Sequence, residues 1–191
     1  MNEDAIVNEI ISKPERCSIC EQLDAVEFHY MCKVQYQVKA DASFRKDFIE
    51  KGVCNHHFWK IATLTSPETV AYMGIAFIEE GRFPLNSCLI CEHLRERETE
   101  LFNQLKDAVA SGHLDDRIKL CQPHFRSVVV QLGGKQAGLF PDIQRLHNEQ
   151  LLKELRGFVE KRDCRAKRDK NESTSWWRSV EKIVGRKGMV S

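Results

Sequence analysis

The chain has 191 residues, of which 42% are hydrophobic and 30% charged, a composition too apolar for a protein that is disordered throughout. Its 29 Lys and Arg residues nearly balance its 28 Asp and Glu residues, so the net charge of +1 gives no support for nucleic-acid or membrane binding along the whole chain. The unusual feature is the Cys content, which is eight residues.

Hydrophobic periodicity predicts helices in the first half of the chain. Apolar residues recur at helical spacing over 23–38, and the stretch 41–52 forms a short helix that ends at a Gly. Further helices are expected over 56–64 and 66–81. The longest apolar run, 70–78, is too short to span a membrane, which takes about 20 residues, and predicts a buried helix segment.

The second half repeats this pattern. Helices are expected over 94–109, 123–134 and 141–163, and a short amphipathic helix over 176–185 with Ser175 as its N-cap. We find no alternating run long enough to predict a strand. The sequence therefore predicts an all-α protein.

The acidic N-terminus has neither the basic segment nor the continuous apolar segment of a secretory signal, so we expect a cytoplasmic protein. In a reducing compartment, clustered Cys residues more often bind metal or carry out redox chemistry than form stable disulfides.

The order of Cys and His residues is the main signal. A CxxC motif at 17–20 and a CxxH motif at 54–57 are followed by a second CxxC at 88–91 and a second CxxH at 121–124. The flanking sequences CSICEQL and CLICEHL agree at five of seven positions. These matches indicate an internal duplication.

Three thiolates and one imidazole complete the closed tetrahedron typical of structural zinc. His57 is preferred to His56 because the position that matches His56 in the second copy is Pro123, which has no ligand atom. The predicted ligands of two structural zinc ions are Cys17, Cys20, Cys54, His57, Cys88, Cys91, Cys121 and His124.

We expect each repeat to hold its own ion, because each contains a complete set of ligands. This gives a first helical repeat over 1–85, a second over 86–160, and a basic linker with a C-terminal amphipathic helix over 161–191. A cross-braced pairing stays open, in which the two CxxC motifs share one ion and the two CxxH motifs share the other. Units of about 40 residues rarely fold on a core alone, so each half should depend on its metal.

Two Cys residues have no counterpart in the repeat. Cys32 lies within a helix and is expected to be a small buried residue, whereas Cys164 lies among basic residues that can lower a thiol pKa. The segment 153–187 has 12 Lys and Arg against 6 Asp and Glu. We expect its apolar residues to dock the last helix on the body rather than to stack on nucleic acid; these are Trp176 or Trp177 with Val180, Ile183 and Val184.

The two CxxC…CxxH repeats and the C-terminal segment together resemble a prokaryotic domain family of unknown function. The C-terminal residues that match are Phe158, Lys161, Arg162, Asp163 and Arg165, followed by Trp177, Arg178, Val184 and Gly185. The chain has Ser18, Asn55, Leu89 and Gln122 where that family often has Pro, and Cys164 where it usually has an aromatic residue. The resemblance implies a helical metal protein without an established reaction.

The leading hypothesis is a non-catalytic, zinc-stabilised adaptor or accessory subunit with protein partners, because four protein ligands leave no open position on the metal. Gly-rich phosphate loops, HExxH and Ser elbows are absent from the sequence. One alternative is an iron–sulfur or dithiol redox protein. The other is a nucleic-acid-binding zinc module that would use Arg165, Lys167 and Arg168. We expect no membrane partner.

Overall fold

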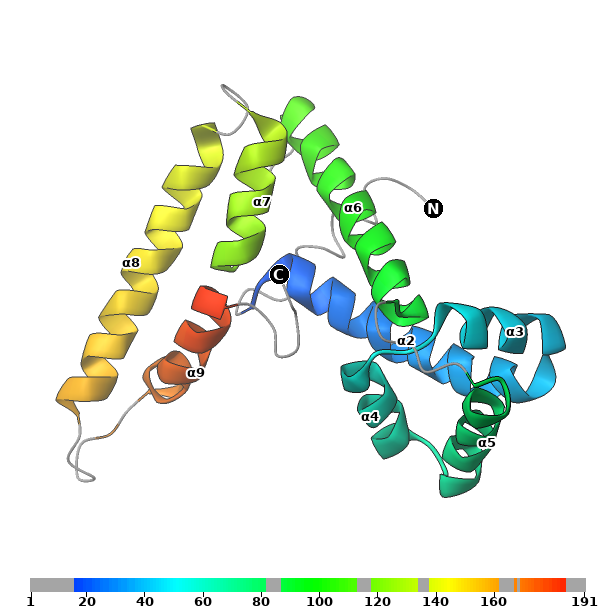
Figure 1. Ribbon diagram of the computed structural model, residues 1–191. Helices are drawn as coiled ribbons and strands as arrows, with labels where there is room; N and C mark the ends of the chain where they lie inside the picture. Colours follow the sequence, from blue (N-terminus) through cyan, green and yellow to red (C-terminus); the bar gives the residue numbers. More distant parts are fainter. Residues whose placement is uncertain are drawn as a thin grey trace. The chain divides into compact units, whose positions relative to one another are not determined.

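The computed structural model describes residues 16–81, 87–112, 118–133, 138–161, 167 and 169–184. All regular structure within these ranges is α-helical, which confirms the predicted fold class. The helices are α2 (Ser18–Ala40), α3 (Ala42–Lys51), α4 (Asn55–Leu64), α5 (Pro67–Glu79), α6 (Leu89–Ala110), α7 (Gln122–Leu132), α8 (Leu139–Glu160) and α9 (Lys170–Val184) (Figure 1). Of the helices described, none is at once long enough and apolar enough to cross a membrane.

Local capping explains why several helices begin and end where the sequence indicates. The Asp41 carboxylate accepts from the backbone N–H groups of Ser43 and Phe44, which satisfies two donors at the start of α3. Ser66 caps α5 in the same way. Gly52 ends α3 at a φ of 75°, a conformation that residues with a Cβ rarely adopt.

The chain divides into two compact units, and their boundaries differ from those of the two sequence repeats. We call residues 23–99 the central unit, and residues 1–22 together with 100–191 the terminal unit. Both divisions fall inside helices, the first in α2 and the second in α6.

In the central unit, α2 to α5 enclose an apolar core. Its fully buried side chains are Met31, Val34 and Val38 of α2, Phe48 of α3, Ile61 of α4 and Met73 of α5. The run 70–78 is helical, as predicted, but it is buried on one face only. Tyr72, Ile75 and Ile78 of this run are exposed, because at 3.6 residues per turn only Met73 and Phe77 face the core.

In the terminal unit, the buried apolar side chains include Leu101 and Leu105 of α6, Val128 of α7 and Phe140 of α8. Helix α9 contacts both α8 and α7 (Figure 1). The unit thus places the N-terminal end of α7 beside the first turn of α2, where the Ser18 N–H donates to the Lys119 carbonyl at 2.9 Å.

Helix α9 differs from the sequence prediction at its start. Asp169 and Glu172 form a reciprocal capping box, in which each side chain accepts from the backbone N–H of the other. The helix therefore begins at Lys170, and the prediction of Ser175 as N-cap was wrong. Ser175 is fully buried within the helix, and its hydroxyl donates to the Glu172 carbonyl.

Candidate metal centres

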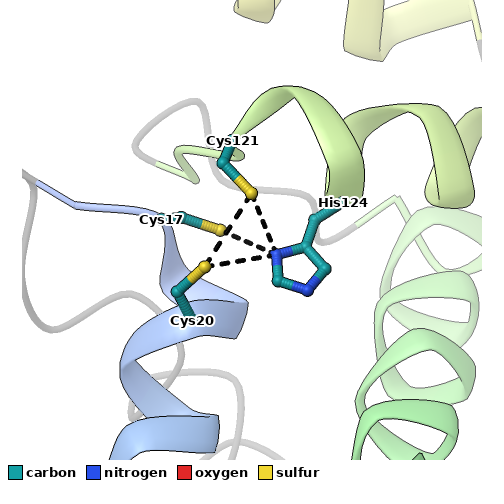
Figure 2. A group of neighbouring side chains, drawn as sticks. All are labelled: Cys17, Cys20, Cys121 and His124. Atoms are coloured by element: carbon teal, nitrogen blue, oxygen red, sulfur yellow. Dashed lines mark hydrogen bonds between the residues drawn. The ribbon is translucent and has the colours of Figure 1, made fainter. Parts of the chain in front are cut away.

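The eight predicted ligands lie in two clusters, each with three Cys and one His. The terminal cluster consists of Cys17, Cys20, Cys121 and His124 and belongs wholly to the terminal unit (Figure 2). The central cluster consists of Cys54, His57, Cys88 and Cys91 and belongs wholly to the central unit. Within each cluster, the four donor atoms all lie within 4.8 Å of one another.

Helix N-termini position every ligand. Each CxxC motif enters a helix, so that Cys17 and Cys88 precede α2 and α6 while the second Cys of each motif lies in the first turn. Each CxxH motif places its Cys at the N-cap, Cys54 for α4 and Cys121 for α7, with nearly identical backbone angles. The positive ends of these helix dipoles stabilise the negative charge of the thiolates.

In the terminal cluster, the imidazole faces all three sulfur atoms. The Nδ1 atom of His124 lies 3.1 Å from the Sγ of Cys121, 3.3 Å from that of Cys17 and 3.4 Å from that of Cys20. The Sγ atoms of Cys20 and Cys121 are 3.8 Å apart. Figure 2 shows these four side chains pointing toward a common centre.

The central cluster has the same geometry. The Nδ1 atom of His57 lies 3.1 Å from the Sγ of Cys54, 3.3 Å from that of Cys91 and 3.4 Å from that of Cys88. The Sγ atoms of Cys54 and Cys91 are again 3.8 Å apart. Two segments of chain that are far apart in sequence therefore build the same donor set twice.

These separations fit one tetrahedral ion. Bond lengths of about 2.3 Å to sulfur and about 2.0 Å to nitrogen place the sulfurs about 3.8 Å apart and the nitrogen about 3.5 Å from each sulfur. The observed edges of 3.8 Å and 3.1–3.4 Å lie close to these values. A disulfide would need sulfurs about 2.05 Å apart. Both clusters could hold a metal ion.

A matching backbone contact supports each cluster. The residue that follows the first Cys of each CxxC donates its N–H to a carbonyl two residues before the Cys of the CxxH. These bonds join Ser18 to Lys119 at 2.9 Å and Leu89 to Gly52 at 3.1 Å. In both clusters, these backbone bonds join the same two motifs that the Cys and His side chains bring together. The grouping of the ligands therefore rests on the backbone as well as on the thiols.

The predicted pairing was wrong. The first CxxC meets the second CxxH, and the second CxxC meets the first CxxH, which we call the exchanged pairing. The exchanged pairing differs from the predicted pairing, in which each repeat holds its own ion. It also differs from the cross-braced pairing. The spacing could not reveal it, because both copies of each motif present the same donors in the same local geometry.

A buried carboxylate contacts the central cluster. The Oε1 atom of Glu27 lies 3.2 Å from the Nε2 of His57 and 2.9 Å from the Nζ of Lys60, and its side chain is 1% exposed. Glu27 thus faces the imidazole from the side opposite the thiols. The sequence analysis missed this residue, although an acid between Leu23 and Met31 on the apolar stripe of α2 is a detectable signal.

The terminal cluster has different neighbours. The ring of Phe102 meets that of His124 edge to face, with centroids 6.1 Å apart. The Lys182 ammonium group donates to the carbonyl of Leu120, next to Cys121, at 2.6 Å. Burial lowers the pKa of Lys182 to about 8, against the opposing effect of the Cys17 and Cys121 thiolates.

Without a metal, the clustered donors change one another's protonation. Burial raises the pKa of the Cys91 thiol to about 12, and the neighbouring Cys88 adds to this effect. Burial disfavours the Cys88 thiolate most strongly, but the hydrogen bond from His57 and the backbone bonds at Cys54 and Cys91 together outweigh it and lower the Cys88 pKa to about 6. Burial disfavours the His57 imidazolium, yet the bonds to Cys88 and Glu27 raise its pKa to about 10.

The terminal cluster divides its protons in a similar way. The thiols of Cys121 and Cys17 raise the pKa of Cys20 far above its ordinary value. Burial opposes ionisation of Cys17, but the bonds from Cys121, Cys20 and His124 lower its pKa well below the ordinary value. In each cluster, one thiol is thus favoured as a thiolate while another keeps its proton, which a bound cation would displace.

The remaining predictions have mixed outcomes. His56 is exposed, as predicted for a surface residue, and lies 3.8 Å from Glu27, with which it and His57 form a third group of donors that could hold an ion. Cys32 lies within α2 as predicted, but it is exposed rather than buried. Cys164, Arg165 and Arg168 lie outside the described residues, whereas Lys167 is described and exposed.

No family model matches the chain, and the comparisons with curated proteins and with solved structures give no match either.

Proposed function

We infer that the protein is a non-catalytic helical adaptor or accessory subunit, stabilised by two structural zinc ions. The observation that supports this most directly is the convergence of three thiols and one imidazole at the separations of a tetrahedron, in both clusters. Four protein donors fill the coordination sphere of zinc, so no position is left for a reactive water or a substrate.

The spacing of the donors favours one ion over an iron–sulfur cluster. In each cluster a single Nδ1 atom lies within 3.4 Å of all three sulfurs. A multi-iron cluster binds its thiolates through different iron atoms and inserts bridging sulfides between them, so the protein sulfurs would have to stand further apart. A cycling dithiol would not need a His donor at the centre of three thiols.

The positions of the ligands support a structural role. Each proposed ion would join a CxxC motif to a CxxH motif that is distant in sequence: Cys20 and Cys121 in one unit, Cys54 and Cys91 in the other. Binding of structural zinc is worth about 10–16 kcal/mol at neutral pH in small domains and is realised as folding free energy. A scaffold held in this way is suited to presenting surfaces to a protein partner.

Metal analysis of the native protein, purified without oxygen or added metal, tests the proposal. We expect two zinc ions per chain and no visible absorption. Bound iron with a brown colour would overturn the assignment. After exchange of zinc for Co²⁺, the d–d spectrum should be tetrahedral and should not change when azide is added. A shift on azide would reveal an open position and contradict the non-catalytic role.

A further inference from the structure

Helix α9 packs on the terminal unit through its polar side. Lys161 of the α8 end bonds both carboxylate oxygens of Glu172 at 2.6 and 2.7 Å, and Arg178 pairs with Glu154 of α8. Arg16 bonds both oxygens of Glu181 at 3.1 and 2.7 Å. The face that a helix usually exposes to water is therefore the one that holds α9 in place.

The opposite face of α9 is apolar and exposed. Trp176, Val180 and Ile183 follow one another at intervals of four and three residues, so they form one stripe, with Trp177 beside it. Their exposed fractions are 50%, 48% and 65%, and that of Trp177 is 52%. Within the described ranges, about half of the surface of these side chains is therefore left uncovered. The prediction that Trp176 or Trp177 docks the helix on the body together with Val180 and Ile183 was wrong, and the Val184 side chain, also part of that prediction, lies outside the described residues.

The sequence that leads into α9 is basic. Glu172 of α9 is paired with Lys161 and Glu181 with Arg16, and Glu181 also accepts from the Nε1 of Trp177 at 3.2 Å. The stretch 161–170, which leads directly into α9, has six Lys and Arg against two Asp in the sequence. The exposed apolar stripe of α9 is therefore preceded in the chain by a stretch with an excess of positive charge.

We propose that the outward face of α9, formed by Trp176, Trp177, Val180 and Ile183, adsorbs to an anionic lipid surface. A basic amphipathic helix that lies in the plane of a membrane inserts aliphatic and Trp side chains at the headgroup boundary, while nearby cations attract the acidic lipids. This inference departs from the absence of a membrane partner expected from the sequence, and it does not depend on which metal the clusters bind.

The size of the stripe favours a membrane over a protein groove. Two half-exposed Trp side chains and two aliphatic ones offer roughly 400 Å² of apolar surface. A stable protein interface buries about 800 Å² on each partner. Adsorption to a membrane needs no complementary groove, because electrostatic attraction adds to the burial of a small apolar face. Nucleic acid would account for the cations and the Trp rings, but it gives no role to Val180 and Ile183.

Vesicle flotation with the full-length, metal-loaded protein tests the proposal. The probes are vesicles of phosphatidylcholine alone and of phosphatidylcholine with phosphatidylglycerol. We expect binding only to the anionic vesicles, weakened by salt. In the Trp59→Phe variant, which leaves Trp176 and Trp177 as the only Trp residues, fluorescence should shift to the blue on binding.

The decisive variant is Val180→Ser/Ile183→Ser, which should fold normally because both side chains are exposed. We expect it to lose at least about tenfold in vesicle affinity. The matched control is Ile75→Ser/Ile78→Ser, an exposed pair with the same spacing on α5, which should bind as the unmodified protein does. Equal binding to both vesicles, no binding, or an unaffected α9 variant would overturn the proposal. Two further results would also overturn the proposal. One is self-association of the protein that is lost in Val180→Ser/Ile183→Ser but kept in the control variant. The other is retention on heparin without binding to vesicles.

Discussion

The carboxylate of Glu27 lies 3.2 Å from the Nε2 atom of His57, whose Nδ1 atom faces the three thiols of the central cluster. An imidazole that binds a metal through one nitrogen commonly donates its other N–H to a carboxylate, which fixes the tautomer and raises the basicity of the donor nitrogen. Lys60 balances the charge of Glu27 at 2.9 Å. Glu27 is therefore placed to accept the second N–H of His57 and to orient its ring.

Replacing Glu27 with Gln should weaken metal binding at the central cluster by about 10–100-fold, the usual effect of removing such a partner. The amide keeps the shape of the side chain but not its charge. Competition with a chromogenic chelator would measure the affinity, and ¹⁵N chemical shifts of His57 would report its tautomer. Glu68→Gln removes a carboxylate that is 86% exposed and should change neither. An unaltered tautomer in Glu27→Gln would contradict the positioning role.

The exchanged pairing predicts which double variants keep an ion. Cys20→Ser/Cys121→Ser removes two ligands of one cluster, so this variant should still bind one zinc ion per chain. Cys20→Ser/Cys54→Ser damages both clusters and should bind none tightly. Pairing within each repeat predicts the reverse result for both variants. Metal stoichiometry of the purified proteins therefore decides between the two pairings.

Removing the metal should unfold the protein locally rather than disable a single site. Each cluster joins distant parts of the chain through a small number of buried contacts, and structural zinc contributes about 10–16 kcal/mol in small domains. After treatment with a chelator, we expect circular dichroism to show less helix and proteolysis to become faster. Adding zinc should restore both. Unchanged helicity and unchanged melting after complete metal removal would refute the structural role.

Metal binding at the central cluster should strengthen as the pH rises. The pKa of Cys88 is about 6 and that of His57 about 10, while that of Cys91 is about 12. Between about pH 6 and 10, zinc must therefore displace at least the protons of Cys91 and His57, so the logarithm of the affinity should rise by at least about 2 per pH unit. Calorimetry in buffers of different ionisation enthalpy would count the released protons. Affinity that does not depend on pH would contradict this scheme.

Local signals in the sequence predicted the helices well, because the apolar stripe of α2 and caps such as Asp41 act over a few residues. They also identified all eight candidate ligands. The pairing could not be predicted, since Cys54 and Cys121 are equivalent N-cap residues and only tertiary contacts choose between them. For α9, periodicity revealed an apolar face, but it could not show whether that face points toward the body or toward solvent. The ion pairs of Arg178 and Glu181 determine this orientation.

The pair of Arg178 and Glu154 should stabilise the docking of α9 on α8. The two side chains are only 14% and 8% exposed, so Arg178→Met would leave a buried carboxylate without its cation. Breaking a buried pair in this way costs about 3–5 kcal/mol. Chemical denaturation of the zinc-loaded protein would measure the loss in the free energy of unfolding.

The control for this prediction is Arg145→Met. Arg145 pairs with Glu149 of α8 at 3.1 Å, but both side chains are more than half exposed, so the loss should stay below about 1 kcal/mol. In the double variant Glu154→Leu/Arg178→Met, much of the lost stability should return, because no unpaired charge is left in the interface. Equal losses for Arg178→Met and Arg145→Met would show that the polar side of α9 is hydrated, and α9 would then have no fixed outward face.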